Sequence, residues 1–331
     1  MSTRPTVATA TQPSANTTEK SGGCPVCGYA QITPFLSAPD RFHLRSEKYT
    51  LARCSFCACV WLMNPPRPAE MGKHYTEDYH KLIAWAGEAS VHRRWKMQRA
   101  RIFQFKQGGA ILDIGCSSGG FLSTMNNGAW QLYGVEMEPS TAERARALSG
   151  AKVWVGDVLE AKFAPDSFDV ITCFDLLEHI YTPREFLAQV GKWLKPGGIF
   201  YTVLPNIDSW EGRTFRTFWY GLELPRHLFH FSPRSLRYLF SLLNFQEMHL
   251  GTPAISYVER SLDYVGSGLL AKFGFHATPQ AAAQKQSPLA WRAIRKGLRL
   301  ISVRPLARVA AAAGAGPSME AVFRKPATLV N

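Results

Sequence analysis

The 331-residue sequence contains no apolar run long enough to cross a membrane, and its first 22 residues hold no apolar core of a secretory signal. Residues 1–22 are instead rich in Thr, Ser, Ala and Pro, a composition that predicts a disordered tail. No internal repeat is apparent, so nothing indicates a repeat architecture. We therefore expect a cytoplasmic protein.

Acidic residues are scarce: the chain has 25 Asp and Glu against 38 Lys and Arg, which gives a formal charge of +13. Residues 251–331 alone hold eleven basic side chains against three acidic ones. Such a charge suggests nucleic acid as a partner. However, the cysteine pairs near the N-terminus are not surrounded by Lys or Arg, and aromatic and basic residues do not alternate there as in RNA readers. Nucleic acid is therefore disfavoured as a partner.

The most informative stretch is residues 111–121, Ile-Leu-Asp-Ile-Gly-Cys-Ser-Ser-Gly-Gly-Phe. A short apolar strand is followed by a glycine-rich turn and by the start of a helix at Phe121, an arrangement that cradles nucleotides. This stretch alone is compatible with two kinds of cofactor, a dinucleotide and S-adenosylmethionine. Gly115-x-Ser117-x-x-Gly120 is an imperfect dinucleotide fingerprint, whereas Asp113-x-Gly115-x-Ser117-x-Gly119 is close to the turn of S-adenosylmethionine (SAM) methyltransferases.

Further strands and turns follow in regular order. Glu136 ends the next apolar run, 23 residues after Asp113, where either cofactor would present its ribose hydroxyls. Thr182–Glu185 predicts a capping box at the start of a helix that runs to Leu194 and breaks at Lys195–Gly198. The predicted strands are Ala110–Ile114, Leu132–Glu136, Val153–Val155, Phe168–Phe174 and Ile199–Leu204.

This succession resembles the class I SAM-dependent methyltransferases over residues 95–250, with a final strand at Met319–Arg324. The matching pieces are Leu112–Gly115, Gly134–Glu136, Gly156-Asp157, Phe168–Val170, Leu177–His179 and Leu194–Gly198. The resemblance implies an α/β fold with a Rossmann-like seven-stranded sheet whose final strand is antiparallel.

The resemblance also implies roles for individual residues toward SAM. Glu136 would bind both ribose hydroxyls, Met137 would pack on the adenine, and Asp157 would accept from the adenine amino group. Phe174 and Asp175 would line the pocket beneath the methyl group. The residues expected against the methionine part are Asp113, Gly115, Cys116, Ser117 and Gly119. Ser117 departs from the glycine that is usual in the family.

Four cysteines form two Cys-x-x-Cys pairs, Cys24/Cys27 and Cys54/Cys57, separated by 26 residues. Such pairs match a tetrahedral structural zinc site. A disulfide framework is the alternative, but it needs an oxidising compartment. Cys59 is a spare thiol beside the second pair. The segment resembles the zinc-ribbon-like head that precedes the SAM domain in many bacterial methyltransferases of sugar, polysaccharide and secondary-metabolite pathways.

The loop Asn206–Phe231 is unusually aromatic and is placed to cover the transferable methyl group. His227 or His230 could take a proton from an acceptor hydroxyl, or one of them could fix the loop. Asp175-x-x-Glu178-His179 resembles an element with which some quinone-type O-methyltransferases bind a divalent ion, but Glu-His there often only fixes the loop under the cofactor. His179 is a secondary candidate for the base.

We expect a disordered tail (1–22), a zinc head (23–68), linker helices (69–107), the SAM-binding core (108–250), a helical insert (251–318) and a final strand with a tail (319–331). The expected activity is methyl transfer from SAM to O, N or C of a small-molecule, sugar or glycan acceptor. An RNA methyltransferase with the head as reader and a non-catalytic SAM-fold scaffold are the alternatives.

One segment of the insert suggests a further partner. Residues 291–301 form a basic amphipathic pattern with Trp291 on the apolar face. It predicts either peripheral membrane contact or an ordinary cap helix that packs on the domain.

Overall fold

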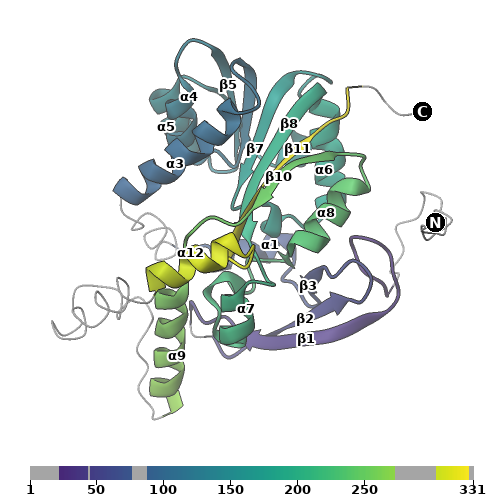
Figure 1. The fold of residues 1–331 in the computed structure, drawn as a ribbon, viewed down its shortest axis with the longest axis vertical. Helices are drawn as coiled ribbons and strands as arrows, with labels where there is room; N and C mark the ends of the chain where they lie inside the picture. Colours follow the sequence, from purple (N-terminus) through teal and green to yellow (C-terminus); the bar gives the residue numbers. More distant parts are fainter. Residues whose placement is uncertain (1–21, 44, 77–87, 273–302, 328–331) are drawn as a thin grey trace, which may run out of the picture.

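Two sheets organise the computed structural model, which describes residues 22–43, 45–76, 88–272 and 303–327 (Figure 1). The larger sheet has seven strands and the smaller one has four. The N-terminal segment forms most of the smaller sheet, which lies beneath one end of the larger sheet in this view. The carboxyl ends of the parallel strands of the larger sheet are the place where ligands bind in open α/β folds.

The seven-stranded sheet has the order β10-β11-β8-β7-β4-β5-β6. Neighbours from β6 to β8 pair in parallel, whereas β11 is antiparallel to both β8 and β10. The strands are β4 (Gly109–Ile114), β5 (Trp130–Glu136), β6 (Lys152–Val155), β7 (Phe168–Phe174), β8 (Leu194–Pro205), β10 (Gln246–Gly251) and β11 (Ser318–Arg324). The prediction of a seven-stranded class I sheet with an antiparallel final strand is confirmed.

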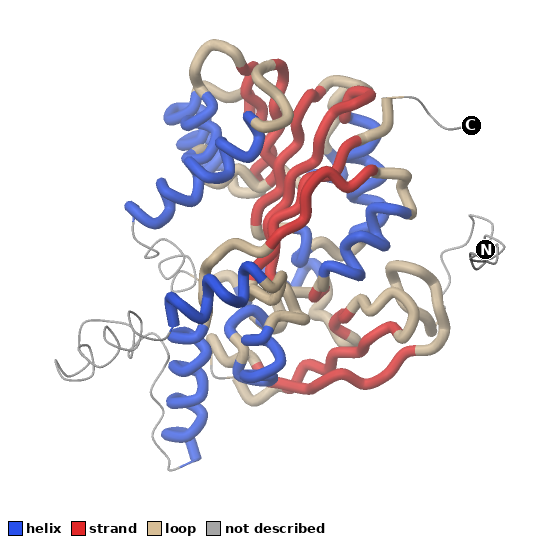
Figure 2. The backbone as a smooth tube through the Cα atoms, viewed as in Figure 1, coloured by secondary structure: helices blue, strands red, loops and turns tan. Residues whose placement is uncertain are grey.

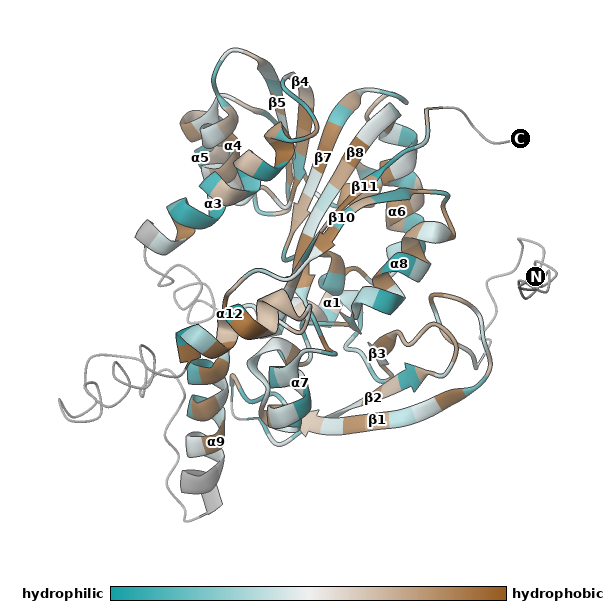
Figure 3. Cartoon of the chain, in the orientation of Figure 1, coloured by the Kyte–Doolittle hydropathy of each residue, from teal (hydrophilic) through white to brown (hydrophobic). Residues whose placement is uncertain are grey.

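Helices cover both faces of this sheet (Figures 1 and 2). One face carries α3 (Glu88–Phe103), α4 (Gly120–Met125) and α5 (Pro139–Ser149), and the other carries α6 (Pro183–Trp193) and α8 (Pro233–Ser241). Because both faces are covered, the central strands are apolar along most of their length, as Figure 3 shows for β4 and β7. The hydrophobic core therefore lies on both sides of the sheet.

Two local predictions around α6 need correction. The expected capping box is absent, because the Thr182 side chain makes no capping hydrogen bond; Pro183 begins the helix without one. β8 starts at Leu194, five residues earlier than expected, because Leu194 still pairs with Phe168 of β7. The expected break at residues 195–198 is an irregularity within the strand, with Gly197 at φ +72°.

The smaller sheet has the order β1-β2-β3-β9. Its first three strands belong to the head, and the fourth comes from the loop that follows β8. The strands are β1 (Ile32–Pro39), β2 (Lys48–Cys54), β3 (Val60–Leu62) and β9 (Phe229–His230). Backbone pairing of Val60 with His230 and of Trp61 with Phe229 makes the head and the loop one structural unit.

The remaining described elements are helical. The link between head and core contains α1 (Pro68–Met71) and a short 3₁₀ turn at Gly72–His74, and α7 (Trp210–Phe215) follows β8. The described parts of the insert contain α9 (Val258–Lys272) and α12 (Arg304–Ala312). The amphipathic segment 291–301 and residues 1–21 lie outside the described residues. Among the described helices, none combines the length and the apolar character that crossing a bilayer requires.

Candidate functional site

The glycine-rich turn between β4 and α4 has a backbone that only glycine adopts freely. Gly115 and Gly119 have φ values of +74° and +78°. A Cβ at Gly115 would lie 3.0 Å from the Leu176 side chain, and one at Gly119 would lie 2.9 Å from the backbone of Ala145. The turn therefore needs glycine at both positions, for conformation and for space.

Ser117 lies in the same turn and also has a positive φ, +49°. This left-handed conformation costs a residue with a side chain roughly 1–2 kcal/mol. The Ser117 N–H donates to Glu136 Oε2 at 3.0 Å, which holds the turn against the end of β5. The departure from glycine is thus accommodated by the backbone geometry of the turn, at an energetic cost.

Carboxylates converge on this turn. Glu136 accepts from the Ser117 N–H through one oxygen and from the Glu138 N–H, at 3.0 Å, through the other. Asp113 is buried at the end of β4 and accepts from Thr172 Oγ1 at 2.6 Å. Burial raises the pKa of Asp113 to about 7, although the Thr172 hydrogen bond acts in the opposite direction. Both side chains are therefore held in place before any ligand arrives.

The other residues expected at the cofactor site follow the carboxyl ends of neighbouring strands. Met137 is 66 % exposed after β5, and Asp157 accepts from the Leu159 N–H at 2.8 Å after β6. Phe174 packs edge-on against Phe121 of α4, with ring centroids 5.0 Å apart. Cys116 is buried, and its Sγ would lie 2.6 Å from a Cβ added at Gly134. The roles of these residues toward SAM stay predictions.

Asp175 has a partner that sequence reasoning missed. Arg94 of α3 donates to Asp175 Oδ2 at 2.9 Å, and both side chains are about half exposed. Trp95, the next residue of α3, lies against Gly120 at the start of α4, where an added Cβ would clash with its ring. Nothing in the sequence near Arg94 indicates this contact, because 81 residues separate the two partners.

The three candidate histidines lie together. The ring centroids of His179 and His227 are 4.7 Å apart, and those of His227 and His230 are 6.1 Å apart. His227 Nδ1 donates to the Gly221 carbonyl and His230 Nε2 donates to the Leu222 carbonyl, each at 3.0 Å. Burial lowers the pKa of His227 to about 3 and that of His230 to about 4. Both rings are therefore neutral at pH 7 and fixed by the loop backbone.

His179 differs from the other two because it is only partly buried. Its Nδ1 lies 2.9 Å from the Tyr75 hydroxyl and 3.0 Å from the Arg226 carbonyl, and no described residue bonds its Nε2. Burial lowers the pKa of His179. Tyr75 belongs to the segment that links the head to the core, so the head side of the chain reaches this cluster. Its contact with His179 was not expected from the sequence.

Glu178 lies beneath the histidines and is 2 % exposed. Neither carboxylate oxygen has a hydrogen-bond partner among the described residues, and His227 Nε2 is 4.0 Å from Oε1. Burial raises the pKa of Glu178 well above its ordinary value. One ligand atom from each of Glu178, His179 and His227 lies within 4.8 Å of the others, so this group is compatible with a divalent ion.

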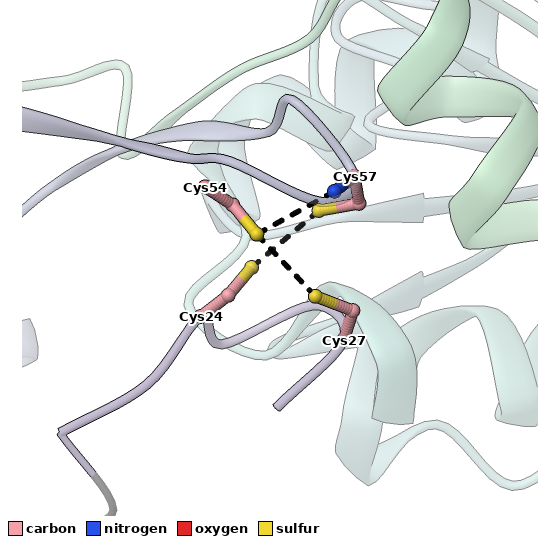
Figure 4. A group of neighbouring side chains, drawn as sticks. All are labelled: Cys24, Cys27, Cys54 and Cys57. Carbon is pink, nitrogen blue, oxygen red and sulfur yellow. Dashed lines mark hydrogen bonds between the residues drawn. The ribbon is translucent and has the colours of Figure 1, made fainter. Parts of the chain in front are cut away.

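The four predicted zinc ligands converge on one point (Figure 4). Cys24 Sγ is 3.6 Å from Cys57 Sγ, and Cys27 Sγ is 3.5 Å from Cys54 Sγ. Zn–S bonds of about 2.3 Å in a tetrahedron place sulfurs about 3.8 Å apart. The sulfur positions thus fit zinc, and all seven cysteines are free thiols. Cys59 is buried but stands outside the four-sulfur group.

The two cysteine pairs differ at the residue that follows each of them. Gly28 has φ +75°, and Ala58 occupies the equivalent place with φ +62°. The Cys57 N–H donates to Cys54 Sγ at 3.5 Å, the N–H···S contact expected of a zinc knuckle. The second pair therefore has the turn of the first, although alanine is disfavoured in that conformation.

The aromatic loop is braced on the head by long-range contacts. Arg226 is 1 % exposed; its Nη1 donates to the His74 carbonyl at 3.2 Å and lies 3.8 Å from Asp40 Oδ2. Arg41 Nε donates to the Thr217 carbonyl at 2.6 Å. Trp219 is buried as well. Much of the loop therefore packs into the joint between head and core.

Comparison with known proteins agrees with this arrangement. Residues 88–250 match the family model described as a methyltransferase domain. The chain is 35 % identical over 111 residues to the ubiquinone biosynthesis O-methyltransferase of Aliivibrio fischeri (strain MJ11), covering 31 % of this chain and 47 % of that protein. It is 34 % identical over 108 residues to the protein of the same name from Yersinia pestis (strain Pestoides F), covering 30 % and 45 %. The chain spans about half the length of these curated relatives.

Two solved structures to which the chain is similar have the names of methyltransferases. One is the Haemonchus contortus phosphoethanolamine N-methyltransferase 2 with SAM, at 18 % identity and a TM-score of 0.46, covering 70 % of this chain and 53 % of that chain. The other is a possible histamine N-methyltransferase from Thermotoga maritima, at 16 % identity and a TM-score of 0.48, covering 77 % and 99 %.

Proposed function

We propose that the chain transfers the methyl group of SAM to a small-molecule acceptor, because residues 88–250 match a methyltransferase domain and the seven-stranded sheet has the class I order. The observation that carries this proposal is the position of Glu136. Its carboxylate lies at the glycine-rich turn and is held by two backbone N–H groups. A fixed carboxylate at that place suits a ligand with two vicinal ribose hydroxyls.

SAM supplies a methyl group that is already activated on a sulfonium, so the protein mainly has to position the acceptor and exclude water. The backbone of Gly115–Gly119 would hold the methionine part, and Asp113 would stand beneath it. Asp175, fixed by Arg94, and Phe174, packed on Phe121, would line the wall under the methyl group. These side chains are placed by the sheet and by α3 and α4.

We propose oxygen as the acceptor atom, in line with the O-methyltransferase names of the curated relatives. The base would be His179 rather than His227 or His230. The latter two are buried and fixed to backbone carbonyls, which favours a bracing role. His179 retains a partly exposed ring whose Nε2 is available for a proton from the acceptor hydroxyl.

We further propose that Cys24, Cys27, Cys54 and Cys57 hold one structural zinc ion. When bound, the ion cross-links the two cysteine pairs of the head and thereby supports β2 and β3. The edge of β3 is already paired with β9, so this side of the head braces the loop, whereas β1 forms the outer edge of the sheet. This arrangement favours the small-molecule function over an RNA reader.

The test is a labelled-SAM assay against a panel of phenols, catechols and sugars. His179→Ala should lower kcat by ~10²–10⁴ while the affinity for SAM stays unchanged. His230→Gln, which can still donate to the Leu222 carbonyl, should keep most of the activity. Equal activity of wild type and His179→Ala on a hydroxyl acceptor would exclude His179 as the base.

A further inference from the structure

A concave site lies between the head and the segment after β8, apart from the glycine-rich turn. It is a groove of about 290 Å³. One wall comes from β1 and β2, with Phe35, Leu36 and Arg53, and the other from α7 and the residues beside it, with Asp208, Arg213 and Arg216. None of these residues has a part in the cofactor cradle or in the histidine cluster.

The groove carries more positive than negative charge. Arg53 Nη2 is 2.7 Å from Asp208 Oδ1, and this is the ion pair that joins the two walls. Arg213 and Arg216 have neither an ion pair nor a side-chain hydrogen bond with any described residue. Three guanidinium groups thus face one carboxylate, which leaves a charge of +2 in a concave site.

Arg53 is pre-positioned in the groove. Its guanidinium lies over the Phe35 ring, 4.4 Å from the ring centroid, and its Nη2 pairs with Asp208. Phe35 and Asp208 together hold the guanidinium in one orientation, which lowers the entropic cost of binding an anion.

The chemistry of these groups defines the ligand. Planar guanidinium groups recognise phosphate and carboxylate oxygens through paired hydrogen bonds. A phosphoryl monoester carries a charge of about −1.5 to −2 at pH 7, which matches the uncompensated charge of +2. Phe35 and Leu36 provide an apolar wall for a ring attached to that group.

We propose that this groove binds the phosphoryl group of a small ligand through Arg53, Arg213 and Arg216. The site does not depend on the proposed methyl transfer, because it is formed by the joint between head and core. The phosphoryl group has two conceivable sources, a phosphorylated acceptor or a free phosphate ester, and the same guanidinium groups serve both.

The experiment is calorimetric titration of the full-length protein with phenyl phosphate, with inorganic phosphate and with phenol, at constant ionic strength. Phenyl phosphate should bind, inorganic phosphate should bind more weakly, and phenol should not bind. The double variant Arg213→Gln/Arg216→Gln should weaken phenyl phosphate binding at least tenfold. Arg184→Gln removes another exposed arginine on α6 and should change nothing. Unchanged SAM affinity and thermal unfolding would verify that the double variant is folded.

Equal phenyl phosphate binding by wild type and the double variant, or no binding at all, would overturn the proposal. Tighter binding of a 20-nucleotide RNA that the double variant loses would identify a nucleic-acid backbone as the occupant and would also overturn it. The source of the phosphoryl group is tested with labelled SAM and a metabolite extract. Loss of labelled product after phosphatase treatment of the extract assigns the group to the acceptor, and retained product assigns it to a separate ester.

Discussion

Two regions of this molecule are held together in different ways. We call the region around the glycine-rich turn, where we propose that SAM binds, the cofactor half, and the loop Asn206–Phe231 with the head against which it packs, where we propose that the acceptor binds, the acceptor half. Around the glycine-rich turn, the hydrogen bonds that fix the carboxylates join residues 19 and 59 positions apart. Between the aromatic loop and the head, the corresponding contacts span 152, 155 and 176 positions. The cofactor half is built from consecutive strand–turn–helix units, whereas the acceptor half exists only when distant segments meet.

The two halves also differ in how many polar groups they bury. The cofactor turn depends mainly on glycine conformations and on backbone N–H groups, and it contains one buried carboxyl, Asp113, which Thr172 holds. The joint with the head buries Asp40, Arg226 and two neutral histidines, His227 and His230. Buried polar groups are stable only when their partners stay in place. A substitution that destabilises the head should therefore also destabilise the loop Asn206–Phe231, but it should leave the cofactor half stable.

The largest expected effect is the loss of the metal, which should lower the stability of the head and not that of the cofactor half. Cys57→Ser should release the one zinc ion expected per chain and destabilise the head by several kcal/mol, since metal binding and folding are coupled at such sites. Elemental analysis and thermal unfolding measure the two outcomes. Cys59→Ser, which alters a buried thiol outside the four-sulfur group, should retain the metal. Freshly purified, reduced protein without zinc would contradict the assignment.

The buried histidines predict an acid-labile acceptor half. The unfolded imidazoles bind protons below about pH 6.5, whereas folded His227 and His230 stay neutral down to about pH 3 and pH 4. The unfolded state therefore binds more protons in this window, and stability falls as the pH falls. Each histidine should contribute a loss of about 2 kcal/mol at pH 5 relative to pH 7.5.

The matched measurement compares denaturant unfolding of wild type with that of His230→Gln and His227→Asn at the two pH values. Each variant preserves the donor to the loop carbonyl and removes the titrating group. The comparison between proteins is needed because the raised pKa of Asp113, about 7, acts in the opposite direction over the same range. Identical pH slopes for wild type and both variants would show that the rings do not remain neutral.

On the cofactor side, Glu136→Ala should weaken SAM binding at least tenfold, a loss of ~1.4 kcal/mol or more, while zinc content stays unchanged. The carboxylate is the group expected at the ribose, and its removal also frees the Ser117 N–H. Calorimetry with SAM measures the loss. Wild-type affinity in the variant would place the ribose elsewhere.

The smallest effects come from the two disfavoured turns, one in each half. Ala58→Gly and Ser117→Gly should each stabilise the protein by up to about 1 kcal/mol, because glycine relieves a left-handed backbone but loses more entropy on folding. Gly28→Ala should act in the reverse direction, since the space around its added Cβ is open and only the backbone conformation opposes it. Thermal unfolding of the three variants measures these changes. Lower stability of both Ala58→Gly and Ser117→Gly would contradict the prediction that glycine relieves the strain at these positions.

The same contrast explains what could be predicted from the sequence. The strands of the parallel part of the sheet and the glycine-rich turn follow from local apolar runs and turn residues, so they were predictable. The antiparallel final strand was expected only from the resemblance to class I methyltransferases. The four zinc ligands were predictable as candidates because their spacing is itself a signal. The pairing of β3 with β9, the Arg94–Asp175 contact and the bond between Tyr75 and His179 were not. These contacts depend on how distant segments pack, and no residue pattern near either partner encodes that.

The capping box at Thr182 shows the limit of a local signal. Thr182, Pro183 and Glu185 have the right order, but the backbone of Thr182 has φ −127° and ψ +70°, and its side chain makes no cap. Pro183 alone is enough to begin the helix, because its missing N–H needs no partner in the first turn. A motif thus located the helix without giving its geometry.

The cofactor site is tested by calorimetric titration of the purified chain with SAM and, separately, with NADH. We expect micromolar SAM binding, a smaller loss of SAM affinity than of head stability in Cys57→Ser, and no comparable heat from NADH. Tight binding of NADH without any heat from SAM would contradict the central claim that the turn at residues 115–119 and Glu136 form a SAM site.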